Sequence, residues 1–392
     1  MAKNIDTVFD YIKWRADLSF KDSPFNEVDA LILARFSYFP FDGLIPYDKT
    51  DITISEACEY INSRKELVDF TIEGDNTLVL ALQNNKRFGD LKLGYYRNHI
   101  DESRVKQFSA ITIFLDDKTE FISYRGTDNT IVGWKEDFLM TFSDVIPSQK
   151  EAKAYIMDVA KQNHNKIIIG GHSKGGNLAM YAGSFIPNVI KHRIIKVYSF
   201  DGPGFNHKAI NSKKYLESVD KIKSFIPQTS IVGVMLEHKE ETRVIHSSGF
   251  GPMQHDIYTW EIDINKLKYL ENNTTASTIL DSSFENYLTS LSTYERKQFV
   301  DILFDIVEAS GVETFNDIKS NFIKILPSIL ERISKMDKKS ASALFEGIKV
   351  LVGSIAGNAS EEFVKAISNL GEEAKLSIAN LINKYKPSKK DE

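Results

Sequence analysis

The residue whose surroundings point most directly to chemistry is Ser173, which stands in the segment Gly171-His-Ser-Lys-Gly175. An apolar run, residues 166–170, precedes this segment, and residues 175–185 follow it with the pattern of a helix. A serine at a tight turn between strand and helix is held out at the carboxyl edge of a sheet, where glycines two positions before and after it avoid a clash. The pattern is typical of a nucleophile elbow and predicts that Ser173 is a nucleophile.

Two other roles are open to the same segment. A glycine-rich turn can merely connect a strand to a helix, and some glycine-rich loops bind phosphate. The phosphate-binding spacing, Gly-x-x-x-x-Gly-Lys-Ser/Thr, is missing from the chain at this point. The strand before Ser173 and the helix after it favour the nucleophile over the purely structural turn.

A serine hydroxyl is a weak nucleophile at neutral pH, so a histidine has to accept its proton. The histidines that follow Ser173 are His192, His207, His238, His246 and His255. His255 lies in a short polar loop, residues 251–260, and is the predicted base. His246, at the end of a strand-like run, is the alternative. Either could also be an ordinary hydrogen-bonded histidine at the surface or at a sheet edge.

A carboxylate must orient the histidine, and Asp201 is the favoured candidate. It directly follows the strand-like residues 195–200, so it should share the carboxyl edge of the sheet with Ser173. Glu237 and Asp256 are the alternatives. The sequence Asp201-Gly-Pro is equally compatible with an aspartate that only forms a turn.

The oxyanion of a tetrahedral intermediate needs two hydrogen-bond donors. One is normally the backbone N–H of the residue after the nucleophile, here Lys174. The other must come from an earlier loop, and Thr127, after a predicted strand, offers a backbone N–H and a hydroxyl. We expect the side chain of Lys174 to be exposed and to take no part in the chemistry.

The elements around these residues predict an α/β fold. A helix is expected within residues 25–40, and two strands, 109–115 and 120–125, should form a hairpin. From residue 150 on, helices alternate with short apolar strands, which is typical of a mostly parallel sheet with helices on both faces. The expected elements of this part are a helix at 151–163, the strand and helix around Ser173, and strands at 194–200 and 221–226.

Strand patterns stop near residue 270, so we predict an α/β-hydrolase domain over residues 1–270. Residues 271–385 have apolar positions at helical spacing and are expected to form an all-helical C-terminal region. Residues 386–392 are expected to be a disordered, solvated tail.

Composition narrows the class of protein. Of the 392 residues, 42% are hydrophobic and 26% charged, as in ordinary globular proteins, and the formal net charge of -5 does not favour binding to nucleic acid. The single cysteine, Cys58, excludes an intramolecular disulfide, favours a reducing compartment and should be a small buried residue. No signal peptide and no apolar run of roughly 18 to 20 residues is found, so a cytoplasmic protein is expected. We expect no metal ion and no cofactor.

Several motifs together resemble the class 3 (fungal-type) lipases, over roughly residues 105–260. These motifs are Tyr124-Arg-Gly-Thr-Asp128, Gly133-Trp-Lys-Glu-Asp137, Gly171-His-Ser-Lys-Gly-Gly-Asn177 and Val197-Tyr-Ser-Phe-Asp-Gly-Pro-Gly204. Further segments, among them Asp10-Tyr-Ile-Lys-Trp-Arg15 and Gln254-His-Asp256, resemble a mostly uncharacterised bacterial branch of lipase-like hydrolases.

The resemblance implies an α/β-hydrolase with Ser173 as nucleophile, Thr127 and Lys174 as oxyanion donors, His255 as base and Asp137 in a structural role. Class 3 lipases place the acid in a loop after the next strand, but the corresponding residues 226–230 contain no carboxylate. This departure makes Asp201 more attractive as the acid. Lys174 also replaces an apolar residue common in lipases, so an apolar acyl pocket is not implied.

The favoured function is hydrolysis of small-molecule or lipid carboxylic esters by a Ser-His-Asp triad through an acyl-enzyme on Ser173. The alternative is a catalytically weak or inactive hydrolase fold that acts as an interaction or regulatory module through its helical C-terminal region. A third hypothesis is peripheral membrane contact through residues 344–355, although packing against protein explains that segment better because its polar face has only Lys349.

Overall fold

The structure is a computed structural model that describes residues 6–270, except 66–71, 73, 84, 129, 229, 231 and 250. The chain divides into two compact units, Met1–Asp128 with Ser143–Leu280, and Asn129–Phe142 with Asp281–Glu392. The described part of the second unit contains one helix, α5 (Ile131–Leu139). The predicted helical region 271–385, the tail 386–392 and the segment 344–355 lie outside the described residues.

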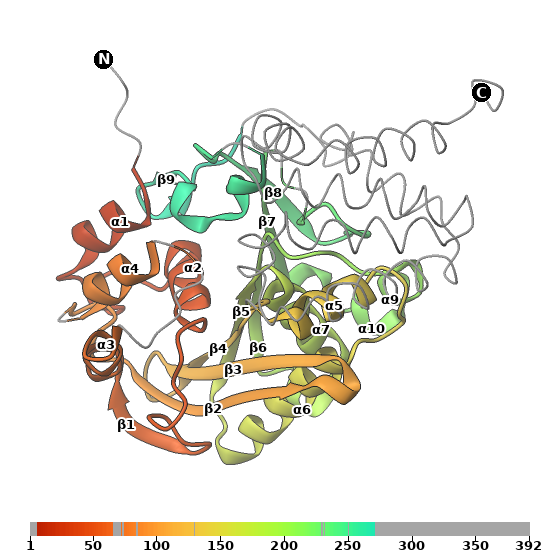
Figure 1. Ribbon diagram of the computed structural model, residues 1–392, viewed down its shortest axis with the longest axis horizontal. Coiled ribbons are helices and arrows are strands. Elements are labelled where there is room, and N and C mark those ends of the chain that lie inside the picture. The colour runs from red at the N-terminus through yellow and green to blue at the C-terminus, as the bar shows by residue number, and fades with distance from the viewer. Residues whose placement is uncertain are drawn as a thin grey trace, which may run out of the picture. The chain divides into compact units, whose positions relative to one another are not determined.

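An eight-stranded sheet lies at the centre of the first unit, and its strands lie side by side in the order in which they occur along the sequence (Figure 1). Strands β1 to β4 run antiparallel, and β4 to β8 run parallel. The strands are β1 (Lys49–Thr53), β2 (Lys92–Asp101), β3 (Lys106–Phe114), β4 (Thr119–Tyr124), β5 (Lys166–His172), β6 (Ile194–Phe200), β7 (Ile222–Pro227) and β8 (Glu241–Ile245). A small second sheet pairs β9 (Ile262–Asp263) with β10 (Lys266–Leu267).

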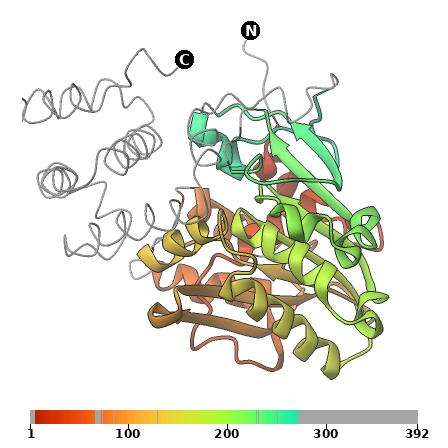
Figure 2. The same ribbon diagram turned by 90° about the vertical axis from the view of Figure 1, so that its right-hand side faces the viewer.

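Helices cover both faces of the large sheet. Helix α2 (Glu27–Phe36) packs on β4, β5 and β6 from one side, while α6 (Pro147–Gln162) and α7 (Lys174–Phe185) pack on the other (Figure 1). In Figure 2 the side of the sheet that carries α6 and α7 faces the viewer. The other α-helices in the described part of the first unit are α1 (Val8–Arg15), α3 (Ile54–Asn62), α4 (Gly74–Leu82), α8 (Asn188–Lys191), α9 (His207–Ile210) and α10 (Lys213–Leu216). This is an α/β-hydrolase-like fold, as predicted.

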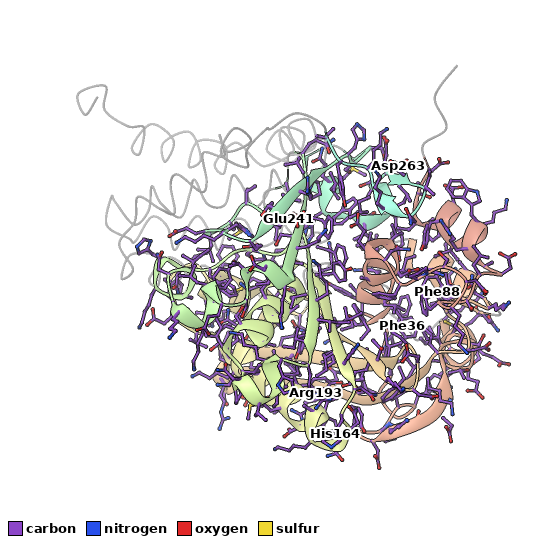
Figure 3. The ribbon with its side chains drawn as sticks, turned by 180° about the vertical axis from the view of Figure 1, so that it is seen from behind. Phe36, Phe88, His164, Arg193, Glu241 and Asp263 are labelled. Carbon is purple, nitrogen blue, oxygen red and sulfur yellow. The ribbon has the colours of Figure 1, made fainter. Side chains whose placement is uncertain are left out.

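Helix α2 is central to the core on its side of the sheet. Its N-terminus is capped by Asn26, whose side chain accepts hydrogen bonds from two backbone N–H groups of the first turn. Nine of its ten residues are buried, including Phe36, which belongs to the same buried apolar cluster as Phe88, on the same side of the sheet (Figure 3). The helix carries two buried charges, Asp29 and Arg35, and each is neutralised by an ion pair.

Most of the predicted elements are confirmed, with small changes of bounds. The predicted hairpin is β3 and β4, and the strand predicted at 166–170 extends through His172 as β5. Cys58 is buried within α3, where burial raises the pKa of its thiol to about 12. Figure 3 places His164 and Arg193 together at the amino ends of β5 and β6, which is the edge of the sheet opposite Ser173.

Candidate active site

The candidate site lies where four parallel strands end side by side. Tyr124 of β4 pairs with Gly171 of β5, and Phe200 of β6 pairs with His172 of β5 and with Phe225 of β7. Because these strands run in the same direction, the residues that follow them meet at one edge of the sheet. The turns after β4, β5 and β6 therefore bring Gly126, Ser173 and Asp201 to the same region.

Ser173 occupies a sharp turn between β5 and α7. Its backbone has φ 59° and ψ −135°, a conformation that residues with a side chain rarely adopt, and the residue is half-buried. A Cβ atom on Gly171 would lie 2.3 Å from the carbonyl group of Gly175, and one on Gly175 would lie 2.1 Å from the carbonyl oxygen of Tyr124. Both glycines are thus required by close packing around the turn, as the sequence pattern indicates.

His255 and Asp201 are joined by a hydrogen bond. His255 ends the 3-10 helix η4 (Gly251–His255), and its Nδ1 donates to Oδ2 of Asp201 at 2.6 Å. The aspartate is fully buried, while 30% of the imidazole side chain is exposed. With its proton fixed at Nδ1, the neutral ring carries its basic lone pair at Nε2, on the side away from the carboxylate.

The second oxygen of Asp201 is held from the segment after β7. Ser230 donates its hydroxyl to Oδ1 of Asp201 at 2.5 Å, and the backbone N–H of Gly233 donates to Oγ of Ser230 at 3.0 Å. A Cβ atom on Gly233 would approach Oδ1 of Asp201 to 2.2 Å. The carboxylate is therefore fixed at both oxygens, and the chain next to it has no room for a larger residue.

His172, directly before Ser173, contacts the His255 loop. Its Nε2 donates to the backbone carbonyl of His255 at 2.9 Å, and the centroids of the two rings lie 4.4 Å apart. Its Nδ1 lies 3.3 Å from the hydroxyl of Tyr38, which donates to the backbone carbonyl of His172 at 3.2 Å. Burial, together with the nearby His255 and Arg35, lowers the pKa of His172 well below its usual range, so the ring stays neutral. Sequence reasoning missed this residue, although its place inside the elbow was a usable signal.

The side chain of Lys174 corrects an expectation. It is 1% exposed rather than exposed, and its Nζ donates to Oε1 of Gln107 at 2.6 Å. The first turn of α7 lies against β4 and β5, so the lysine cannot reach solvent and ends instead on β3. The general preference of lysine for the surface is overridden here by a buried polar partner.

Thr127 follows the end of β4 and is half-buried. The preceding residue, Gly126, packs so closely on the elbow that a Cβ atom there would lie 3.1 Å from Cβ of Ser173. The same atom would lie 2.0 Å from the hydroxyl of Tyr38. The Gly126 to Thr127 segment therefore begins directly beside the candidate nucleophile.

The alternative residues have partners of their own. Nδ1 of His246 lies 2.7 Å from Oε1 of Glu261, and Glu237 lies 3.1 Å from Nδ1 of His207. Asp256 accepts a hydrogen bond from the backbone N–H of Tyr258, and burial raises its pKa. The carboxylate on Nδ1 of His255 is that of Asp201.

The remaining sequence-based expectations concern the second unit and ligands. Asp137 lies on α5, in the second unit. Across the described part of the chain, no group of three or more His, Cys, Asp and Glu side chains is placed to hold a metal ion. In the same residues, no helix has both the length and the apolar character needed to cross a membrane.

Comparison with solved structures returns lipases at low similarity. The Rhizomucor miehei lipase–propeptide complex is 18% identical over 50% of this chain and 66% of that chain, with a TM-score of 0.32. The M37 lipase is 16% identical over 52% and 68%, with a TM-score of 0.33. The Lip2 lipase from Yarrowia lipolytica is 14% identical over 43% and 69%, with a TM-score of 0.28. This chain spans just under two thirds of the Rhizomucor miehei lipase chain.

None of the curated proteins matches the sequence. A family model does. It is that of the Mbeg1-like family, and it matches residues 82–305, which include β2 to β8, the Ser173 elbow and the His255 loop. Because the match covers more than half of the 392 residues, the chain belongs to the Mbeg1-like family.

Proposed function

We propose that this protein is a serine hydrolase that cleaves carboxylic esters through an acyl-enzyme on Ser173. The observation that carries the proposal is the hydrogen bond from His255 to the buried Asp201, at the same edge of the sheet as a serine on a strained strand-to-helix turn. A histidine oriented by a carboxylate can accept a proton from such a serine, which is the requirement for nucleophilic attack.

In the proposed reaction, Oγ of Ser173 attacks the ester carbonyl carbon while its proton moves to Nε2 of His255. Asp201 holds the imidazole in the required tautomer and stabilises the imidazolium. Collapse of the tetrahedral intermediate breaks the bond to the alcohol, which takes the proton from His255. Water, activated by the same histidine, then releases the carboxylic acid and restores Ser173.

The developing negative charge needs donors close to Ser173. The backbone N–H of Lys174, at the start of α7, and that of Thr127, beside Gly126, are the proposed oxyanion donors. The close packing of Gly126 against Ser173 supports this assignment, because it keeps the Thr127 segment adjacent to the reacting atom. Small-molecule or lipid esters are the proposed substrate class.

The direct test combines an active-site probe with hydrolysis of short p-nitrophenyl esters. A fluorophosphonate probe should label the wild type and not Ser173→Ala, and the variant should lose hydrolysis to the background rate. His164→Ala, at the opposite edge of the sheet, is the matched control for handling and folding and should label like wild type.

Labelling that persists in Ser173→Ala would refute the proposal. A folded wild type that neither labels nor hydrolyses esters would favour the alternative, a hydrolase fold that has become an interaction or regulatory module.

A further inference from the structure

A buried lysine and a buried glutamine lie together behind the elbow. Nζ of Lys174 donates to Oε1 of Gln107 at 2.6 Å, and the two residues are 1% and 0% exposed. Lys174 begins α7, and Gln107 is the second residue of β3. Burying an ammonium group costs free energy unless polar atoms compensate it. The buried position of Lys174 therefore needs an explanation.

Gln107 also reaches the segment after β4. Its Nε2 donates to the backbone carbonyl of Gly126 at 3.4 Å. The sheet explains the approach, because β3 and β4 pair in a register that sets Ala110 opposite Tyr124, and the backbone N–H of Arg125 donates to the carbonyl of Ser109. Continuing that antiparallel register brings the start of β3 alongside the chain that follows β4.

The carbonyl of Gly126 and the N–H of Thr127 belong to one planar peptide unit. A hydrogen bond that fixes the direction of the carbonyl therefore fixes the direction of the N–H at the other end. The orientation of the glutamine amide matters as well, because its oxygen can only accept a hydrogen bond and its nitrogen can only donate one. The ammonium of Lys174 requires the oxygen on its own side, which leaves Nε2 facing Gly126.

We propose that the side chains of Lys174 and Gln107 are positioning residues that set the direction of the Thr127 N–H for the oxyanion. This inference rests on the proposed serine hydrolase function. Lys174 then serves the site twice, since its backbone N–H is one oxyanion donor and its side chain, through Gln107, orients the other. The lysine found where lipases commonly have an apolar residue thus belongs to the catalytic edge.

Gln107→Glu is the sharpest variant, because the carboxylate still accepts from Lys174 but cannot donate to the carbonyl of Gly126. We expect kcat for a p-nitrophenyl ester to fall by about tenfold to a hundredfold with KM little changed, a loss somewhat below that of deleting an oxyanion donor. The inhibition constant of a phenylboronic acid, which forms a tetrahedral adduct with serine, should rise by a similar factor.

Lys174→Met tests the other half of the pair, because it removes the ammonium and keeps the backbone N–H. It should lower kcat in the same direction and weaken boronate binding. Gln107→Met, which removes the donor without adding a charge, replaces Gln107→Glu if the latter does not fold. Thermal unfolding of each variant checks that the protein remains folded.

Gln149→Glu is the matched control, since Gln149 is also a buried glutamine whose Nε2 donates, in its case to Asn177. It should leave kcat and boronate binding near the wild-type values. Equal losses in the Gln149 and Gln107 variants, or wild-type kcat in the folded Gln107 and Lys174 variants, would overturn the inference. A wild type that shows no labelling at Ser173 would instead refute the proposed function itself.

Discussion

Ser230 donates its hydroxyl to one oxygen of Asp201 at 2.5 Å, while the other oxygen of the same carboxylate accepts from His255 at 2.6 Å. Ser230 stands in the segment after β7, where the resemblance to class 3 lipases would place the acid. Here the carboxylate follows β6 and the hydroxyl follows β7. The two positions face each other, so a carboxylate from either strand end can lie close to the imidazole.

This relationship predicts that the acid can be moved. Asp201→Asn should lower kcat by about 10³ to 10⁴, because the imidazole loses its orienting carboxylate. Adding Ser230→Asp to that variant should raise kcat by at least about twofold over the single variant, since the new carboxylate starts within hydrogen-bond reach of position 201. Ester hydrolysis by the single and double variants measures both effects. A double variant no more active than Asp201→Asn would contradict the prediction.

His172 predicts a pH dependence of stability. Its pKa in the folded protein lies well below the ordinary value of 6.5, so below that pH the unfolded chain binds a proton that the folded chain does not. Stability should therefore be complete above 6.5 and fall as the pH drops below it, by up to about 1.4 kcal/mol per pH unit from this group.

Denaturant unfolding between about pH 5 and 7 checks this slope. His172→Asn should flatten it, whereas the same change at the exposed His164 should leave it unaltered. Nitrogen chemical shifts of the His172 ring that report protonation near pH 6.5 would contradict the buried neutral state.

Glu240 predicts a second, more acidic loss of stability. Burial disfavours its charge, but hydrogen bonds and charge from His238, with hydrogen bonds from Ser224 and Tyr215, outweigh that effect and lower its pKa from 4.5 to about 2. The folded state therefore gains from this carboxylate above pH 4.5 and loses the gain as the pH falls toward 2. Glu240→Gln should be less stable than wild type at neutral pH, with the difference shrinking through that window in acid unfolding. A difference that stays constant would refute this assignment.

The buried ion pair between Arg35 and Asp75 predicts a large effect on folding. Arg35 donates to both oxygens of Asp75, at 2.6 and 2.5 Å, and both side chains are almost fully buried. Asp75→Asn should lower the free energy of unfolding by about 3–5 kcal/mol, because it leaves an uncompensated buried charge. The exposed pair of Lys92 and Asp51 is the control, and Asp51→Asn should change the free energy of unfolding by less than about 1 kcal/mol. Similar effects of the two substitutions in denaturant unfolding would be inconsistent with this account.

The central parallel strands β5 and β6 can be predicted from the sequence because each is a short, largely apolar run with helices before and after it. The elbow around Ser173 adds glycines whose spacing has one simple steric explanation, and Asp201 follows a strand end that must share the same edge. The hydrogen bond between His255 and Asp201 agrees with that reasoning, while the catalytic roles of these residues remain predictions.

Other features depend on contacts between distant parts of the chain. The hydroxyl of Tyr38 meets His172 across 134 positions, and Lys174 meets Gln107 across 67. Neither contact can be predicted from neighbouring residues in the sequence, because each joins side chains that are distant along the chain. A buried lysine also cannot be told from an exposed one by its sequence context. The antiparallel strands β1 and β2 were also not predicted, since their polar residues and irregular register hide the alternation expected of a strand.

Helix α2 has a consequence for where the folding unit begins. The family match starts at residue 82, after this helix, yet α2 covers the apolar side chains of Phe121, Ile168 and Phe200, and Tyr38 follows directly behind it. A fragment cut at that boundary would expose these side chains to water, at about 1.5–3 kcal/mol for each. It would also leave His172 without its tyrosine. The minimal stable protein therefore has to include the N-terminal helices, although they lie outside the segment that the family model matches.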